Sequence, residues 1–289
     1  MSVLRFESIG TRWELVTDEP LPAEARELVS AIIARFDAEW SRFRADSVVS
    51  RLRAHGGAVP APKDATAMLD TYRELSAATQ GAVNPLVGAG LEALGYDAGI
   101  SLKPGAPQAA PQDWERMLRW TASELTLLEP ALIDVGALGK GRLVDLVAEA
   151  LEGVPGSLIV DAGGDLRVQG RTVRVGLEHP YDPNSAIGVV EVADRALCAS
   201  AVNRRAWGDG LHHVLDARTG QPVHTWVATW AIADDAMHAD AAATALFFDG
   251  GTELAARWGV DWVRMSTDGS AEWSHGFDGE LFRAEASSR

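Results

Sequence analysis

The spacing of apolar residues changes along the chain, and this change constrains the fold more than any other feature. In the first part, apolar residues recur every three or four positions, the spacing of a helix that buries one face. The clearest run comprises Leu28, Ile32, Phe36, Trp40 and Phe43. In the C-terminal half, short apolar runs between Gly and Asp turns indicate strands. We therefore expect an α+β fold, with mixed, largely antiparallel sheets and packed helices in one compact domain of two lobes.

Capping and turn residues bound the expected elements. Asp46-Ser47 and Asp64 are cap signals for two helices, one through Leu52 and one closing near Gly81. Segment 103–112 holds three prolines and is expected to be a surface loop or lobe joint within a single domain, 1–289. The expected strands are 3–9, 11–16, 125–128, 131–135, 158–161, 166–168, 172–177, 188–192 and 226–232, and two later helices are expected at 143–151 and 236–248.

Charge and cysteine content limit the partners and the compartment. The chain has 289 residues, with 26 Lys plus Arg against 41 Asp plus Glu, a formal charge of −15. Such an acidic surface repels nucleic acid and anionic membranes, so neither is an expected partner. A phosphate ligand would need a local cation, backbone N–H groups or a lysine. The single cysteine, Cys198, and an N-terminus without an apolar leader favour the cytoplasm.

Segment 134–141, Asp-Val-Gly-Ala-Leu-Gly-Lys-Gly, follows an expected strand and opens an expected helix. Glycines there permit close backbone approach, and free N–H groups at a helix start can bind an anion. Lys140 adds a positive charge. The spacing matches neither the Walker nor the dinucleotide-binding glycine motif. By itself the pattern leaves a structural turn and a ligand loop equally open.

Three further segments carry polar groups. Segment 161–165, Asp-Ala-Gly-Gly-Asp, is first interpreted as a hairpin turn. Segment 212–220 places two histidines, an aspartate and an arginine in one polar loop. Asp240 and Thr244 lie four apart on a helix of small residues, so their oxygens share one face and could coordinate a hard cation. A helix cap and a hydroxyl bonded to the preceding turn explain that pair equally well.

Taken together and in order, these segments resemble the ApbE family, the FAD:protein FMN transferases. The resemblance runs from about Phe6 to Gly251 and rests on several motifs. They are Ile9-Gly10-Thr11, Phe36 with Ser41-Arg42-Phe43-Arg44 to Leu52, Gly81 to Gly88 with Leu94-Gly95-Tyr96, Asp134 to Gly141 with Asp145, Asp161 to Asp165, His213 to Pro222, and Ala239 to Ala245.

The resemblance implies an FAD site with Mg²⁺ at the pyrophosphate, and transfer of FMN to a threonine hydroxyl of an acceptor flavoprotein with release of AMP. The implied metal residues are Ala137, through its carbonyl, Asp240, Ala243 and Thr244. The implied FAD contacts are Ile9, Phe43, Leu94, Gly95, Tyr96, Asp134, Lys140, Gly163, Gly164, Asp165 and Ser200. His213 is the candidate acid or base near the attacking hydroxyl or the leaving AMP.

The sequence departs from the family pattern at a few of these positions. The family's usual residues are replaced by Ile9, Leu94, Asp161, Ala201, Asn203 and Ala217. Two other functions remain open on the sequence: an FAD pyrophosphatase, in which water replaces the threonine, and an FAD carrier without turnover. Asp240, Thr244 and His213 together favour turnover, because a passive binder does not need all three.

Overall fold

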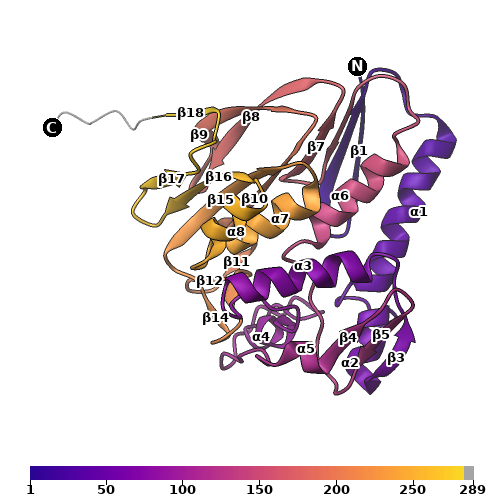
Figure 1. Cartoon of the computed structure of the whole chain (residues 1–289), viewed down its shortest axis with the longest axis vertical. Coiled ribbons are helices and arrows are strands. Elements are labelled where there is room, and N and C mark those ends of the chain that lie inside the picture. The colour runs from indigo at the N-terminus through magenta and orange to yellow at the C-terminus, as the bar shows by residue number, and fades with distance from the viewer. Residues whose placement is uncertain (283–289) are drawn as a thin grey trace.

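An eight-stranded sheet forms the upper part of the molecule in Figure 1, a computed structural model that describes residues 1–282. Every neighbouring pair in this sheet is antiparallel, in the order β1-β2-β6-β7-β10-β15-β16-β17. The strands are β1 Ser2–Ser8, β2 Thr11–Thr17, β6 Leu158–Asp161, β7 Asp165–Gln169, β10 Ala196–Ala201, β15 Trp226–Ala233, β16 Asp261–Ser266 and β17 Ala271–Trp273. The predicted antiparallel α+β architecture is confirmed.

Two helices, α6 (Gly139–Ala150) and α7 (Ala236–Ala245), pack against each other and against one face of this sheet (Figure 1). The side chain of Asp235 caps α7 by accepting a hydrogen bond from the His238 N–H. The helix consists mostly of alanine, so its backbone can lie close to α6, β10 and β15. Helix α8, Gly251–Arg257, follows it and contacts it.

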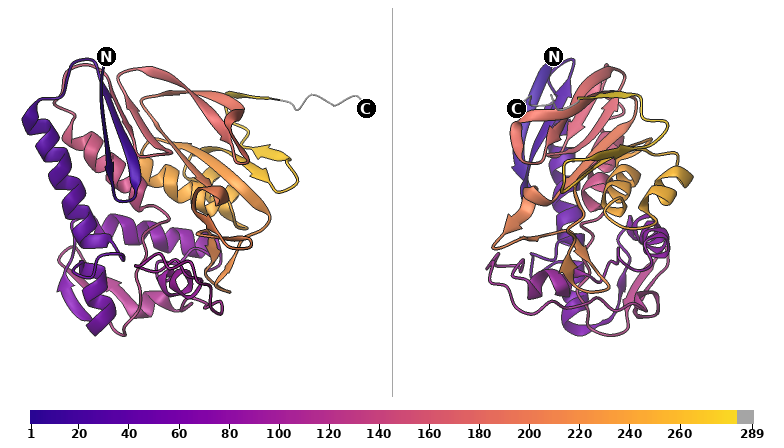
Figure 2. Two further views of the ribbon diagram at one scale, coloured as in Figure 1. Left: turned by 180° about the vertical axis from the view of Figure 1, so that it is seen from behind. Right: turned by 90° about the vertical axis from the view of Figure 1, so that its left-hand side faces the viewer.

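Helices and a small sheet from the first half of the chain form the lower part of the molecule, and α1 (Ala23–Trp40) runs along one side of the molecule from the upper part down to it (Figures 1 and 2). Helix α3 contacts α7 and α8, and α1 contacts α6, so the two parts are packed together. The elements are α1 Ala23–Trp40, α2 Val48–His55, β3 Gly57–Pro60, α3 Ala65–Ala78, α4 Gly88–Ala93, α5 Trp114–Met117, β4 Leu118–Trp120 and β5 Glu124–Leu127, with the three strands ordered β3-β5-β4.

The remaining strands form three small antiparallel sheets, β18-β9-β8, β11-β12 and β13-β14. Their bounds are β8 Thr172–His179, β9 Asp182–Ala193, β11 Ala206–Trp207, β12 Leu211–His212, β13 Leu215–Asp216, β14 Gln221–Pro222 and β18 Gly279–Leu281, with a short 3₁₀ helix at Val202–Arg205. Within residues 1–282, no helix is both long and apolar enough to cross a membrane.

Two expectations about the helices need correction. Helix α1 buries Phe36 and Trp40 as predicted, together with Val29 and Ile33, because these four residues share one helical face. Leu28 is 46% exposed, and Phe43, which lies beyond the helix end at Trp40, is 40% exposed. Asp64 precedes α3 but makes no cap bond, since its carboxylate accepts a hydrogen bond from Arg142 instead.

The predicted strand at 131–135 is absent, because this segment joins no sheet. The Asp134 N–H donates to the carbonyl of Pro85, in a loop, and not to a neighbouring strand.

Candidate functional site

The loop that leads into α6 is braced by a buried tyrosine. The Tyr72 hydroxyl donates to the Asp134 carbonyl, at 3.0 Å, and accepts from the Ala137 N–H, at 3.3 Å. One Asp134 carboxylate oxygen accepts from the Gly136 N–H, at 2.7 Å. Because both ends of the turn are held, the backbone that carries the Ala137 carbonyl and the Lys140 side chain has a fixed conformation.

Helices α6 and α7 meet backbone to backbone at Gly141. A Cβ atom there would lie 2.1 Å from the Ala236 carbonyl oxygen, so only glycine fits. The Gly141 N–H donates to the Asp240 carboxylate at 3.0 Å. Residues 134–141 and 239–245, two of the motifs predicted to act together, are therefore in direct contact.

Three ionisable groups meet where α6, α7 and β7 converge. Lys140 forms an ion pair with Asp165, whose side chain is fully buried and whose second carboxylate oxygen has no hydrogen-bond partner. Burial and the charge of Asp165 raise the pKa of Asp240 to about 7, and Lys140 opposes this increase. Burial lowers the pKa of Lys140, but Asp165 and Asp240 together raise it above its ordinary value. Two carboxylates with one ammonium leave this cluster able to accept a further cation.

The oxygens available to such a cation come from side chains and backbone. The Thr244 hydroxyl donates to the Ala137 carbonyl at 3.2 Å, which brings together two of the predicted metal residues. The Ala243 carbonyl accepts from the Thr229 hydroxyl at 2.6 Å. Among residues 1–282, no three His, Cys, Asp or Glu side chains form a metal-holding group. A carboxylate, a hydroxyl and a carbonyl are nevertheless the hard oxygen donors that suit Mg²⁺.

Segment 161–165 forms the turn between β6 and β7, as predicted. Asp161 accepts hydrogen bonds from the N–H groups of Gly163 and Gly164, at 2.7 and 3.2 Å. Both glycines have positive φ angles, 71° and 117°, which side chains disfavour. The turn ends at Asp165, so it places this carboxylate opposite Lys140.

A second group of residues, which we call the aromatic platform, consists of Phe43, Tyr96 and Trp207. Tyr96 stacks on Trp207 with ring centroids 5.6 Å apart, and meets Phe43 edge to face at 5.4 Å. Phe43 is 40% exposed, whereas Trp207 is nearly buried and donates its ring N–H to the Leu94 carbonyl at 2.8 Å. The platform therefore has a buried base and an accessible outer ring.

Gly95 brings the chain back beneath this platform. Its φ is +93°, and a Cβ atom would lie 2.5 Å from the Lys103 backbone nitrogen. Leu94 is buried, and its side chain belongs to a small apolar cluster with Leu91, Trp207 and Leu215. Tyr96 therefore supplies an aromatic face, while Gly95 allows the backbone of Leu102 and Lys103 to pack closely beside it.

Arg42 connects the platform to the α6 loop. Its Nε atom donates to Asp134 at 2.6 Å, and one terminal nitrogen donates to the Tyr96 carbonyl at 2.8 Å. The centre of the guanidinium lies 4.2 Å from the Phe43 ring centroid and 4.9 Å from that of Tyr96. Asp134, Phe43 and Tyr96, which the sequence analysis placed in one site, are therefore joined through a residue that it did not select.

His213 follows β12 and has a buried Nδ1 atom without a hydrogen-bond partner. Burial, with smaller effects from Arg205 and Lys140, lowers the pKa of His213 to about 3. The imidazole is therefore neutral near pH 7, and so low a pKa makes it a weak proton acceptor in the free protein. The adjacent His212 is buried and contacts the Val223 carbonyl at 2.9 Å, so the two histidines have different environments.

Two predicted contacts lie at the ends of strands of the large sheet. Ile9 occupies the turn between β1 and β2, with φ at +47°, and packs against the main core. A β-branched residue rarely adopts this conformation, which marks a locally strained turn. Ser200 lies on β10 opposite Thr229. No hydrogen bond joins either residue to the α6 loop in the described part of the chain.

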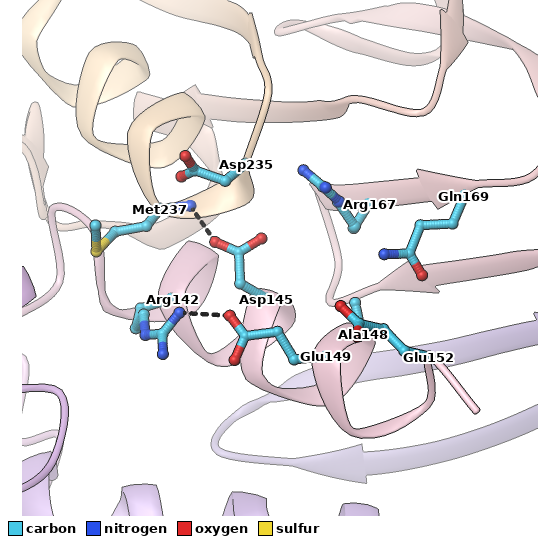
Figure 3. A pocket seen from close by; sticks show the side chains of 9 residues that line it. All are labelled: Arg142, Asp145, Ala148, Glu149, Glu152, Arg167, Gln169, Asp235 and Met237. Carbon is cyan, nitrogen blue, oxygen red and sulfur yellow. Dashed lines mark hydrogen bonds and ion pairs between the residues drawn. The ribbon is translucent and has the colours of Figure 1, made fainter. Parts of the chain in front are cut away.

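A cavity of about 330 Å³ lies at the other end of the contact between α6 and α7 (Figure 3). Its lining residues are Arg142, Asp145, Ala148, Glu149, Glu152, Arg167, Gln169, Asp235 and Met237. Asp145 accepts from the Ala236 and Met237 N–H groups, both at 2.8 Å, and thereby fixes the start of α7. Burial raises the pKa of Asp145 to about 6. None of the predicted metal or FAD residues lines this cavity.

Sequence reasoning missed Arg42, Tyr72 and Trp207. Arg42 had a visible signal, because it stands directly before Phe43 in a selected motif. Tyr72 looked like an ordinary core position of a helix, and its hydroxyl partners lie more than sixty residues away. Trp207 is one of 10 Trp residues, and the sequence does not distinguish it from the others.

Comparison with known proteins gives a consistent assignment. The model of the ApbE family matches residues 9–262. The chain is 28% identical over 298 residues to "FAD:protein FMN transferase" of Rhodobacter capsulatus, covering 92% of this chain and 55% of that protein. It therefore spans about half the length of that relative. It is 29% identical over 259 residues to the protein of the same name from Treponema pallidum (strain Nichols), covering 77% and 70%.

The fold is likewise shared with solved structures. The ApbE protein of Thermotoga maritima matches with a TM-score of 0.82 and 22% identity, covering 95% of this chain and 97% of that one. The flavinyl transferase ApbE of Pseudomonas stutzeri, in its apo form, matches with a TM-score of 0.79 and 23% identity, covering 95% of each chain. Because the family model covers most of the sequence, this chain belongs to the ApbE family.

Proposed function

We propose that this protein transfers the FMN part of FAD to the hydroxyl of a threonine in an acceptor flavoprotein, with release of AMP and dependence on Mg²⁺. The observation that carries the proposal is the convergence of Lys140, Asp165 and Asp240 beside the paired oxygens of Thr244 and Ala137. The names of the two relatives support FAD as substrate and a protein as acceptor.

In this proposal the cation is held by Asp240, Thr244 and the Ala137 carbonyl, with Ala243 beside them. When bound, Mg²⁺ supplies positive charge at the pyrophosphate of FAD. The raised pKa of Asp240 supports this assignment, because a buried carboxylate near a second carboxylate is stabilised by a cation. Lys140, which forms an ion pair with Asp165 in the free protein, directs its positive charge toward the same phosphates.

The rest of FAD is bound by residues that present rings, carboxylates or close backbone. The aromatic platform and Gly95 accommodate a planar ring, and Asp134 accepts hydrogen bonds from the dinucleotide. The remaining proposed contacts are Ile9, Leu94, Gly163, Gly164 and Ser200.

His213 acts in this proposal as the general base. Its neutral imidazole accepts the proton of the acceptor hydroxyl while the threonine oxygen forms a bond to the FMN phosphorus. The bond from that phosphorus to the bridging oxygen breaks, and the oxygen leaves with AMP. Lys140 stabilises the negative charge that develops on the phosphates.

The cytoplasmic location that the sequence favours stays a prediction.

The test is incubation of the purified protein with FAD and Mg²⁺, with and without an acceptor protein that carries a candidate threonine. We expect the acceptor to gain the mass of one FMN, with AMP released only when metal is present. Release of AMP without an acceptor mass gain would support a pyrophosphatase instead. Bound FAD with no AMP under any condition would support a carrier.

A further inference from the structure

The guanidinium of Arg42 contacts three of the proposed FAD-binding residues, Asp134, Phe43 and Tyr96. Its side chain is only 2% exposed. Two of its nitrogens donate to Asp134 and to the Tyr96 carbonyl, and its central carbon lies over the rings of Phe43 and Tyr96. Its remaining terminal nitrogen has no hydrogen-bond acceptor.

A buried charge without full hydrogen bonding needs another source of stabilisation. Here the ion pair with Asp134 stabilises the charge, and the negatively polarised ring faces of Phe43 and Tyr96 add to it, because a cation over an aromatic ring is attracted to the ring's electrons. A guanidinium is planar and donates in fixed directions, so it can stack on rings and bond in its own plane at the same time. An ammonium has neither property.

The proposed FAD contacts held by Arg42 come from separate parts of the chain. Phe43 follows α1, Tyr96 follows α4, and Asp134 precedes α6. Phe43 and Tyr96 each present part of their surface to solvent, and Asp134 is 13% exposed through its side chain. Arg42 itself lies beneath them. It therefore fixes the relative placement of groups that a ligand can touch, without being exposed itself.

We infer that Arg42 is a positioning residue for the flavin dinucleotide, holding the aromatic platform and the Asp134 carboxylate in the arrangement that binds it. This inference rests on the proposed function. Arg42 acts through the groups it holds and takes no part in the bond changes at phosphorus. Its loss should therefore weaken the binding of FAD and leave the chemical step nearly unchanged.

The experiment compares Arg42→Lys with Arg53→Lys in the full chain. Arg53 offers a matched control, because it makes two guanidinium hydrogen bonds to Glu92 at the surface and touches neither an aromatic ring nor Asp134. For both variants, KM for FAD and kcat are measured with saturating acceptor and Mg²⁺. The change in the flavin absorption spectrum on binding is titrated in parallel, without acceptor.

We expect Arg42→Lys to raise KM for FAD and the spectroscopic Kd about ten-fold, with kcat within about two-fold of wild type. Arg53→Lys should leave all three values unchanged. An unchanged KM and Kd in Arg42→Lys would overturn the inference, as would a fall in kcat at unchanged KM, which would assign Arg42 to the chemical step.

Thermal melting checks that each variant is folded. If Arg42→Lys does not fold, Arg42→Gln takes its place with the same expected rise in KM, and if neither folds, Arg42 is a structural residue and the inference fails. A wild-type protein that neither binds FAD nor transfers FMN would instead refute the proposed function, whatever the variants do.

Discussion

The charged cluster and the aromatic platform differ in the elements that supply their residues and in how deeply those residues are buried. The cluster of Lys140, Asp165 and Asp240 is supplied by regular elements, two helices and a strand, and its carboxylates are buried. The platform of Phe43, Tyr96 and Trp207 is supplied largely by loops and short strands, and its outer ring is open. One region depends on fixed charge, and the other on stacking surface.

This difference predicts that substitutions in the two regions affect different kinetic constants. Electrostatic stabilisation inside a protein is strong and depends on exact placement, so changes in the charged cluster should affect turnover. Ring stacking contributes smaller and more graded energies, so changes in the platform should mainly affect the affinity for FAD. Variants of each region, each with a matched control, test this separation.

The largest expected effect is that of Asp240→Asn. Removing this carboxylate should lower the rate of metal-dependent transfer about 1000-fold, which is about 4 kcal/mol. The melting temperature should not fall, because the change also removes a buried charge whose pKa is raised by burial and by Asp165. Transfer assays and melting curves measure both effects, and exposed Asp249→Asn, just beyond α7, is the control. Retained activity would remove Asp240 from the proposed metal site.

The next effect concerns stability at the start of α7. The folded pKa of Asp145 is about 6, above its ordinary 3.8, so the folded state keeps this proton as the pH rises from about 4. The wild-type protein therefore loses stability through this window, and Asp145→Asn does not. Between pH 4 and 7, the unfolding free energy of Asp145→Asn should therefore rise by about 3 kcal/mol relative to that of the wild type.

Urea unfolding of both proteins at several pH values measures this shift. Asp18→Asn is a control of opposite sign, because hydrogen bonds from Ser157 lower the pKa of Asp18. Its variant should lose stability relative to wild type as the pH rises through the range in which Asp18 ionises. Equal pH dependence of Asp145→Asn and wild type would contradict the raised pKa.

Replacing the proposed base, His213, should lower the rate of transfer less than Asp240→Asn does. His213→Ala is expected to lower kcat about 100-fold with little change in KM for FAD. Because the pKa of His213 is about 3, the pH profile of the wild-type enzyme should show no limb from this residue between pH 5 and 8. Exposed His224→Ala is the control. Undiminished transfer by His213→Ala would end its assignment as a base.

The smallest expected effect is on the aromatic platform. Trp207→Leu removes the ring stacked on Tyr96 and the hydrogen bond to the Leu94 carbonyl. KM for FAD should rise about ten-fold, equivalent to about 1.4 kcal/mol, with kcat within about two-fold. Trp207→Phe should give an intermediate KM, and exposed Trp273→Leu no change. A fall in kcat alone would erase the distinction between the two regions.

Sequence patterns predicted the long helices and five strands of the large sheet, β1, β2, β6, β7 and β15, because periodic burial marks them. They did not predict β10, β16 or β17, which belong to the same sheet. They did less well where partners come from far along the chain. Segment 131–135 resembles a strand in sequence, yet its Asp134 N–H donates to the Pro85 carbonyl in a loop. Asp64 resembles a helix cap, yet its carboxylate serves Arg142, which lies 78 residues away.

The candidate site divides in the same way. The resemblance selected Lys140, Asp165 and Asp240 as separate motifs, and the fold brings them into one charged cluster. Spacing alone left Asp240 open between a cap and a ligand; in the fold its carboxylate accepts from Gly141, on another helix, and Asp235 caps α7 instead. The contacts of Arg42 and Tyr72 are visible only in the tertiary structure.

The sequence by itself determined the fold class, the main elements and the order of the motifs, because these depend on local periodicity and on residue identity. Only the tertiary structure decided which charges meet, which carboxylate carries a raised pKa and which arginine joins the platform to the α6 loop. Those properties depend on distance and burial, and both arise when segments far apart in the sequence pack against each other.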